Sequence, residues 1–535
     1  MARRRGAALG AVTMAAALAV AGCGGGTTPV GNGADGTTGG GSGAGGGTVR
    51  VAISSGISTY DPALACTTQY EYAVVKNTYD TLVQYSAQPG ADGKREIVAD
   101  LAKSWTVGDD GLTYTFKLRD DVKFASGNPM TSADVVYGLQ RVLDKEGCQA
   151  YVLTLGDEAG VKSIKAVDDH TVRITLAKEN PIFLGQLTQT GLSPVDRKEL
   201  AKHGGLGKQG DAWLARHTAG TGAYTITQDD PDAQIDLTAR KDYWQGTPKN
   251  DKVSIKVVTD PTTLETLVRA NELDMAYGVP AKDTKSIAEG RTLVNDIGPF
   301  FIYLGMNNGV KPFDDVRVRQ AVALALDRNA LVEQLGYGQV EAFDGPMPPA
   351  MPYSPKSKPP AADVAKAKQL VSEAGAQGAS FTVDIKSGEA FQQEVATILQ
   401  ASLKEIGISV KIHTLGASAF IDRVGGFKSQ AYLIRDGSPF NDPAYFLGFF
   451  VKCDNAFNWT KYCNKRVDEL LAQGRVETDE AKRTAQYKEL SDIVTRERPM
   501  IPIFALGANL IASKTLKGYT TYDDQQPVFW PISTR

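Results

Sequence analysis

The chain has 535 residues, and at about 150 residues per domain this length predicts two to four domains. Its formal net charge of −3 argues against a nucleic-acid surface, which needs clustered lysine and arginine. Four histidines leave little room for metal or acid–base chemistry, and no apolar run reaches the ~18 residues that span a bilayer.

The first residues predict export. Arg3 to Arg5 give a positive start, a short apolar stretch follows, and Leu18 to Cys23 reads LAVAGC. This ending resembles the lipobox of bacterial lipoproteins, so we expect residues 1–22 to be a signal peptide and Cys23 to carry a lipid. The alternative is an ordinary secretory peptide with a chance cysteine. Residues 23–47 are mostly Gly, Thr, Ser and Ala, the composition of a flexible tether.

Four cysteines follow the tether, and four cysteines allow three pairings. An exported chain meets an oxidising environment, so disulfides are expected. Cys453 and Cys463 lie close together on either side of one loop, so we pair them, which leaves Cys66 for Cys148. The segments offer no closely spaced Cys and His ligands, so no metal site is expected.

The folded part begins with a predicted strand at 48–54, a loop, and a helix at 70–79. Gly56 and Tyr60 belong to that loop, at the carboxyl end of a strand, where α/β proteins usually bind ligands. We therefore take Gly56 and Tyr60 as candidate ligand-binding residues.

Residues 98–143 predict a hairpin followed by a helix. Apolar and polar residues alternate over 112–118, which indicates a strand with one apolar face, and Asp110-Gly111 supplies the turn before it. A second hairpin is predicted at 161–177, with His170 as a solvated residue in or just after its turn.

The second half of the chain alternates strands and helices. An apolar strand at 300–307 precedes a helix at 315–325, with Asp314 as the expected N-cap. The segment 381–412 reads strand, helix, strand, which predicts a parallel β-α-β unit. Residues 516–535 are expected to return to the first domain.

Several blocks together resemble the large solute-binding proteins of bacterial ABC importers, in the peptide, dipeptide and nickel class. In chain order the blocks are the DPA loop with YDTLV, then DDGLTYTFKLRDDVKF, SADVVYGLQR, GTGAY with YW, and PFDDVRVRQA with ALDR. The family has its blocks in the same order. The resemblance implies an α/β fold, a two-lobed periplasmic-binding-protein-like (type II) clamp with an extra inserted domain. It implies a binding protein rather than an enzyme, and the chain has no G-x-S-x-G elbow and no H-E-x-x-H motif.

The resemblance also implies the domain limits. Lobe I takes 48–81, 191–298 and 513–535, the inserted domain takes 82–190, and lobe II takes 299–512. We expect the lobes to close over a solute by hinge motion, which buries most of the ligand's surface.

In peptide-binding members of this family, an aspartate that holds the peptide's amine lies a few residues before an acidic-Pro pair. The pair here is Asp442-Pro443, and counting back without a gap places Pro439 at the position of that aspartate. Asp436 is the nearest carboxylate, so we take Asp436 and Asp442 as candidate ligand-binding residues. The alternative for Asp436 is a turn residue.

Two aromatic residues complete the candidate site. Tyr303 lies at the start of lobe II, and Trp459 lies inside the Cys453–Cys463 loop. Packing in the core or in the loop is the alternative for both.

The expected function is capture of an oligopeptide or dipeptide and its delivery to an ABC permease with its ATPase subunits. The expected form is a monomer, lipid-anchored to the outer face of the cell membrane, with no cofactor, no metal and no nucleic acid. A non-peptide solute, such as an oligosaccharide or a metal chelate, is the alternative among binding proteins, and an exported hydrolase is a more distant one.

Overall fold

The computed structural model describes residues 46–65, 69–87, 95–145, 147–155, 160–437, 442–519 and 527–534. The predicted signal peptide, Cys23 and nearly all of the predicted tether lie outside these residues, so the lipid anchor stays a prediction. Gly45–Arg535 form one compact unit. Within the described residues, no helix is long and apolar enough to cross a membrane.

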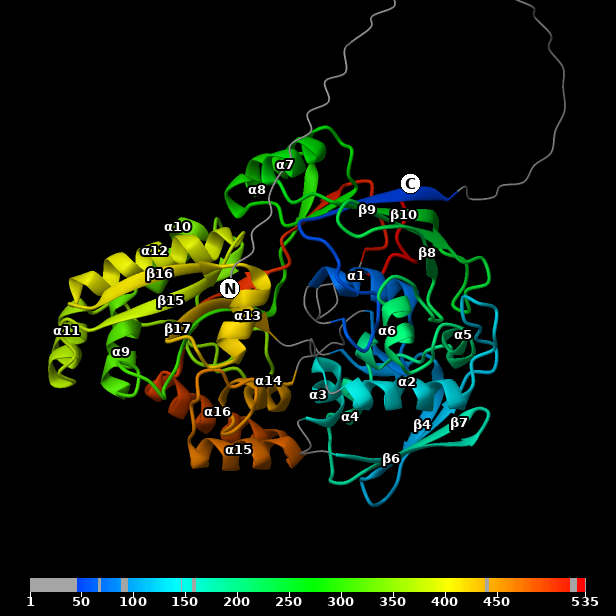
Figure 1. The fold of residues 1–535 in the computed structure, drawn as a ribbon, viewed down its shortest axis with the longest axis horizontal. Coiled ribbons are helices and arrows are strands. Elements are labelled where there is room, and N and C mark those ends of the chain that lie inside the picture. Colours follow the sequence, from blue (N-terminus) through cyan, green and yellow to red (C-terminus); the bar gives the residue numbers. More distant parts are fainter. Residues whose placement is uncertain are drawn as a thin grey trace, which may run out of the picture. The chain divides into compact units, whose positions relative to one another are not determined.

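Among the described residues, the first sheet has seven strands in the order β12-β19-β11-β1-β10-β9-β8. Figure 1 labels β8, β9 and β10 of this sheet. Its middle strand β1 runs parallel to β10 and β11, and buried aliphatic side chains fill the core against it. Phe529 and Ile532 belong to the same core, so the predicted return of the C-terminal segment is confirmed. The strands are β1 (Gly47–Ile53), β8 (Tyr224–Asp230), β9 (Gln234–Ala239), β10 (Asn250–Val257), β11 (Met275–Tyr277), β12 (Arg291–Val294) and β19 (Leu510–Ser513).

The second sheet has six strands in the order β14-β18-β13-β17-β15-β16. β15 and β16 pair in parallel across a helix, so the predicted β-α-β unit is confirmed. The central β13 pairs antiparallel with β17 and β18 and is nearly all buried. The strands are β13 (Ile297–Met306), β14 (Val340–Glu341), β15 (Ser380–Lys386), β16 (Ser409–Leu415), β17 (Ala431–Gly437) and β18 (Met500–Gly507).

The third sheet has four strands in the order β4-β5-β7-β6, and β2 and β3 form a separate pair. Gly111 has a φ of 64° in the turn between β4 and β5, so the predicted hairpin and its left-handed glycine are confirmed. The strands are β2 (Val83–Tyr85), β3 (Ile97–Ala99), β4 (Ala102–Val107), β5 (Thr113–Leu118), β6 (Val161–Asp168) and β7 (Thr171–Leu176).

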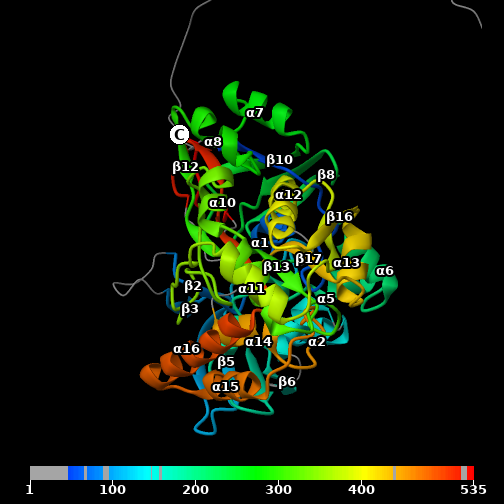
Figure 2. The ribbon, with the colours of Figure 1, turned by 90° about the vertical axis from the view of Figure 1, so that its left-hand side faces the viewer.

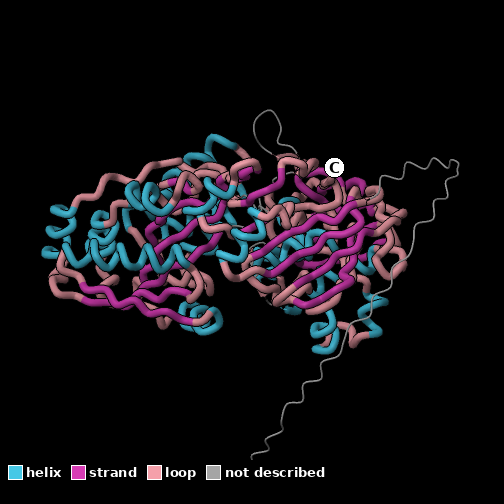
Figure 3. The backbone as a smooth tube through the Cα atoms, turned by 90° about the horizontal axis from the view of Figure 1, so that it is seen from above, coloured by secondary structure: helices cyan, strands magenta, loops and turns pink. Residues whose placement is uncertain are grey.

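Helices flank the strands of each sheet (Figure 3). Those between the strands of the first and third sheets are α1 (Gln69–Thr78), α2 (Ser132–Lys145), α3 (Cys148–Thr154), α4 (Phe183–Gln186), η1 (Thr190–Leu192), α5 (Arg197–Lys202), α6 (Lys208–Leu214), α7 (Pro261–Arg269) and α8 (Ala281–Ile287). Those after β13 are α9 (Val316–Ala325), α10 (Arg328–Leu335), α11 (Val364–Glu373), α12 (Ala390–Glu405), α13 (Ala417–Gly425), α14 (Pro443–Val451), α15 (Lys465–Val476) and α16 (Glu480–Glu497). The helices α15 and α16 pack side by side (Figure 2).

Two cores lie on the two faces of the second sheet. One is built with α9, α11 and α12, and the other with α14, α15 and α16. The second of these cores also takes in buried residues of the third sheet and of α2 and α3. The three sheets draw on much the same stretches of chain as the predicted domains, whose limits stay a prediction.

One local prediction is wrong. The helix expected at 315–325 begins at Val316, and its N-cap is Asp315 rather than Asp314. The Asp315 carboxylate accepts the backbone N–H of Arg317 at 2.8 Å, and it also pairs with the Arg317 side chain. The helix starts one residue late because this aspartate satisfies its first free N–H groups.

Candidate functional site

One face of the second sheet gathers aromatic side chains around a carboxylate. Phe301 lies directly opposite Asp436 in the β13–β17 register, and Tyr303 lies opposite Ile434. Alternate residues of a strand point to the same side, so these side chains share a face with Tyr432. Phe446 and Phe450 of α14 cover that face, with ring centres 5.6 and 6.0 Å from that of Phe301.

Asp436 is a half-buried carboxylate with no ion-pair partner among the described residues. It accepts one hydrogen bond, from the backbone N–H of Gly437 at 2.8 Å. Burial raises the pKa of Asp436 from 3.8 to about 7, and the Gly437 hydrogen bond and the charge of Arg435 oppose this only in part. A cation bound at this carboxylate would relieve the cost of burying its charge.

Three tyrosines lie within the electrostatic reach of Asp436. Burial raises the pKa of Tyr303, Tyr432 and Tyr445, and the negative charge of Asp436 adds to each rise. The rings of Tyr303 and Tyr432 meet edge to face with centres 5.9 Å apart. Aromatic faces beside a carboxylate attract ammonium groups, because each ring carries negative charge on its face.

Tyr445 connects this face to elements outside the second sheet. Its ring centre lies 5.5 Å from that of Tyr151 on α3, and the hydroxyl of Tyr72 on α1 also contributes to the raised pKa of Tyr445. Gln149 of α3 donates its side-chain amide to the Tyr72 hydroxyl at 2.9 Å. Residues from α1, α3, α14 and β17 therefore meet near Asp436.

Arg435 points to the opposite face of β17. Its guanidinium carbon lies 4.8 Å from the centre of the Phe300 ring. Burial lowers the pKa of Arg435, and the charges of Tyr70 and Glu389 oppose that change. The end of β17 therefore carries a positive and a negative side chain in sequence, one on each face.

Gly56 and Tyr60, predicted on a ligand-binding loop, pack against the β8–β9 hairpin. A Cβ atom at Gly56 would lie 2.7 Å from an oxygen of Asp232, so the hairpin approaches this glycine closely. Tyr60 is fully buried, and its hydroxyl donates to Asp229 at 2.6 Å. Arg216 pairs with the same carboxylate. A ligand role for Gly56 and Tyr60 stays a prediction.

Asp442 caps α14 and forms a partly buried ion pair. Its carboxylate accepts the backbone N–H of Ala444 at 2.7 Å and pairs with Arg483 at 2.9 Å. Burial raises the pKa of Asp442, and Arg483 opposes that rise. The contacts of Asp442 with the rest of the protein differ from those of Asp436, which forms no ion pair with a described residue.

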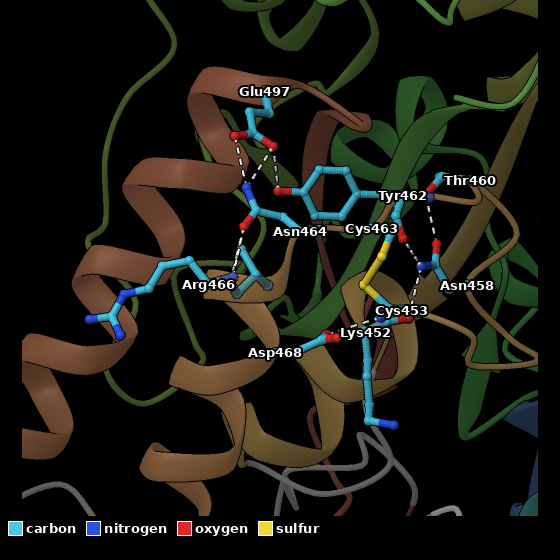
Figure 4. Close-up of a disulfide and its surroundings, with 11 residues drawn as sticks. Lys452, Cys453, Asn458, Thr460, Tyr462, Cys463, Asn464, Arg466, Asp468 and Glu497 are labelled. Atoms are coloured by element: carbon cyan, nitrogen blue, oxygen red, sulfur yellow. Dashed lines mark hydrogen bonds between the residues drawn. A yellow bond between two sulfur atoms is a disulfide. The ribbon is translucent and has the colours of Figure 1, made fainter.

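The predicted disulfide between Cys453 and Cys463 is confirmed (Figure 4). Asn458 braces the loop by donating to backbone carbonyls on both sides, at 2.9 and 2.7 Å. Tyr462 donates its hydroxyl to Glu497 at 2.7 Å. Cys148 is also disulfide-bonded, but its predicted partner Cys66 lies outside the described residues, so that pairing stays a prediction.

Trp459 sits in the disulfide loop and is half-buried. Its ring centre lies 6.2 Å from that of Tyr432, and Tyr432 in turn contacts Tyr303. Phe457 of the same loop stacks on Phe449 of α14 with ring centres 4.5 Å apart. The disulfide loop therefore packs against the aromatic residues around Asp436.

Sequence reasoning missed Tyr432, Tyr445, Tyr72 and Arg435. Tyr432 and Asp436 are four residues apart on one strand, an even spacing that places both on one face. This signal was available, whereas the approach of Tyr72 to Tyr445 depends on contacts between distant segments. The described residues contain no group of three or more His, Cys, Asp or Glu residues able to hold a metal ion.

Residues 96–458 match the family model for bacterial extracellular solute-binding proteins, family 5 Middle. The chain is 29% identical over 489 residues to the glutathione-binding protein GsiB of Escherichia coli O1:K1 / APEC, covering 89% of this chain and 92% of GsiB. The periplasmic binding protein DppA from Helicobacter pylori, in complex with the peptide STSA, has a TM-score of 0.80 and 25% identity, covering 91% of this chain and 98% of DppA. The binding protein AgaA from A. tumefaciens R10, in complex with agropinic acid, has a TM-score of 0.77 and 26% identity, covering 90% of this chain and 96% of AgaA.

Proposed function

The chain belongs to family 5 of the bacterial extracellular solute-binding proteins, and from this premise we propose that it captures an oligopeptide or dipeptide and delivers it to an ABC import permease. The family and the curated relative are binding proteins and not enzymes. A glutathione-binding relative and a relative solved with a bound peptide support a peptide as the ligand.

The observation that carries the proposal is the carboxylate of Asp436, which has no ion-pair partner among the described residues. A peptide's terminal ammonium supplies the cation that this carboxylate lacks, and hydrogen bonds between ionised groups are shorter and stronger than neutral ones. The faces of Tyr303, Tyr432 and Tyr445 add a favourable field for the same ammonium. In this proposal Asp436 takes the role that the family's pattern assigns to the position of Pro439.

The other predicted ligand-binding residues differ in their support. Tyr303 lies on the same face of the sheet as Asp436, whose charge raises the pKa of its hydroxyl. The ring of Trp459 contacts that of Tyr432, which in turn contacts Tyr303, so both residues keep a role in the proposed site. Gly56, Tyr60 and Asp442 each have close contacts within the protein, and a ligand role for these three residues stays a prediction.

The family is extracytoplasmic, and the described residues contain no membrane-spanning helix. We place the protein at the outer face of the cell membrane as a monomer held by lipid on Cys23. Its proposed partners are the permease and ATPase subunits of an ABC importer.

A non-peptide solute is the second candidate ligand. The relative AgaA was solved with agropinic acid, which supports a ligand outside the peptides. The half-buried ring of Trp459 also suits stacking against a sugar ring.

The test is mass spectrometry of the small molecules released when the purified protein is denatured, with the Asp436→Asn variant as the matched control. The proposal predicts peptides from the wild-type protein and fewer from the variant. Recovery of a non-peptide solute would support the second candidate. Recovery of no peptide, together with no heat on titration with peptide mixtures, would overturn the peptide assignment.

A further inference from the structure

A groove away from the candidate site gathers basic side chains. Its lining residues come from α9, from α11 and from the chain around the end of α16, and it encloses about 580 Å³ with its open mouth included. Figure 1 shows these three helices. Its polar lining consists of Lys366, Gln320, Thr495, Arg496 and Arg498. No acidic side chain is among the described residues that line the groove, so three positive charges face it without a lining counter-charge.

Two of the three cations have no ion pair in the part of the chain that the structure describes. Lys366 is exposed, and its ammonium donates to the neutral side-chain oxygen of Gln369 at 3.1 Å. Arg496 is exposed and forms no ion pair with a described residue. Both side chains are therefore available to a ligand.

The third cation shares its counter-charge with a second arginine. Arg498 donates two hydrogen bonds to Asp344, at 2.5 and 2.8 Å, and Arg328 donates to the same carboxylate at 2.8 Å. One carboxylate thus faces two guanidinium groups, which leaves one positive charge uncompensated. Arg328 is 1% exposed, and two of its nitrogens, Nε and Nη2, have no hydrogen-bond partner in the described part of the chain.

The helix ends at the groove do not cancel this charge. The last carbonyls of α16 would give it a negative end, but the carbonyl of Arg496 accepts from Gln320 at 2.8 Å and that of Glu497 accepts from Arg319 at 2.9 Å. The first turn of α11, with the positive end of its helix dipole, contains Lys366. Asp363 caps that turn through the Lys366 backbone N–H and does not line the groove.

We propose that this groove binds an anion of the phosphate class, either a free phosphate group or the phosphate of an acidic lipid headgroup. Arginine and lysine bind phosphate through charge-assisted hydrogen bonds, and the arginine fork matches two phosphate oxygens. Ala323, Leu324 and Leu370 give the groove an apolar floor, which suits a carbon skeleton attached to the phosphate. The groove shares no lining residue with the Asp436 site. The proposal of an anion site therefore holds whichever solute binds at Asp436.

The test compares two double variants. The groove variant carries Lys366→Gln and Arg496→Gln, and the matched control carries Lys404→Gln and Lys411→Gln. The control removes two exposed charges from α12 and β16, outside the groove. Inorganic phosphate and glycerol phosphate are titrated by calorimetry, and sedimentation measures binding to vesicles of phosphatidylglycerol or phosphatidylcholine.

The proposal predicts binding of at least one phosphate probe, about tenfold weaker in the groove variant than in the control, which corresponds to about 1.4 kcal/mol. Binding of the soluble phosphates identifies a free phosphate ligand, and binding of phosphatidylglycerol vesicles alone identifies a lipid headgroup. The proposal is overturned if no probe binds, or if the groove variant and the control bind equally well.

Discussion

Asp436→Asn is expected to stabilise the ligand-free protein. The pKa of Asp436 is about 7 in the folded protein against an ordinary value of 3.8, so the folded state holds the proton more tightly than the unfolded state. The cost of ionising Asp436 is absent below pH 3.8, grows as the pH rises toward 7, and is complete above it. At 1.36 kcal/mol per pH unit the full cost is about 4 kcal/mol. Asparagine carries no charge and keeps an oxygen for the Gly437 N–H.

The assay is chemical or thermal unfolding of both proteins at pH 5 and pH 8. We expect the variant to be more stable by up to about 4 kcal/mol at pH 8 and by about 1–2 kcal/mol at pH 5. The same substitution at Asp442 is the control. It removes the charge partner of partly buried Arg483 and is expected to destabilise the protein by about 3 kcal/mol. A loss of stability in Asp436→Asn, or a gain that does not depend on pH, would contradict the raised pKa of Asp436.

The same variant is expected to bind the ligand more weakly. Losing a buried charge partner costs about 2–5 kcal/mol in a complex, so the dissociation constant should rise about 30-fold or more. Wild-type affinity should also fall as the pH drops below 7, by up to about tenfold per unit, because protonated Asp436 cannot pair with an ammonium. Calorimetry from pH 5 to 8 measures both effects, and a flat wild-type profile would contradict them.

Three further outcomes are expected. Replacing Cys453 and Cys463 by serine should lower the free energy of unfolding by about 2–3 kcal/mol through loss of loop closure, and an unchanged denaturation midpoint would count against this. Tyr445→Leu should weaken ligand binding about twofold to fivefold while Tyr445→Phe, which keeps the ring, stays near wild type; equal effects of the two changes would argue against a role for the ring. Cys23→Ala should release the protein from the membrane fraction into the medium, and continued membrane attachment would contradict the lipid anchor.

Features set by neighbours in the chain could be predicted from the sequence. The turn at Asp110-Gly111 requires only that one residue between the two strands takes the left-handed backbone conformation, and Gly111 takes it. Cys453 and Cys463 flank a loop of the right size and form the expected disulfide. The parallel pairing of the two strands within 381–412 could also be predicted, because one short crossover connects them and such crossovers place their strands side by side.

The candidate site depends on contacts that the sequence does not display. Tyr60 follows a strand as a ligand-binding residue would, but Asp229, from a hairpin far along the chain, occupies its hydroxyl. Asp436 and Asp442 look alike in the sequence. The position of Arg483 on α16 gives Asp442 an ion-pair partner, whereas Asp436 has none among the described residues. The nearness of Tyr445 to Asp436 likewise follows from the packing of α14 on the sheet.

The most direct measurement is calorimetric titration of the wild-type protein at pH 8 with a short peptide and with the same peptide acetylated at its amino terminus. Pairing of the ligand's ammonium with Asp436 predicts saturable binding of the free peptide and binding of the acetylated peptide about 30-fold weaker or more. Equal affinity for the two peptides, or binding of neither, would contradict capture of a peptide through its ammonium at Asp436.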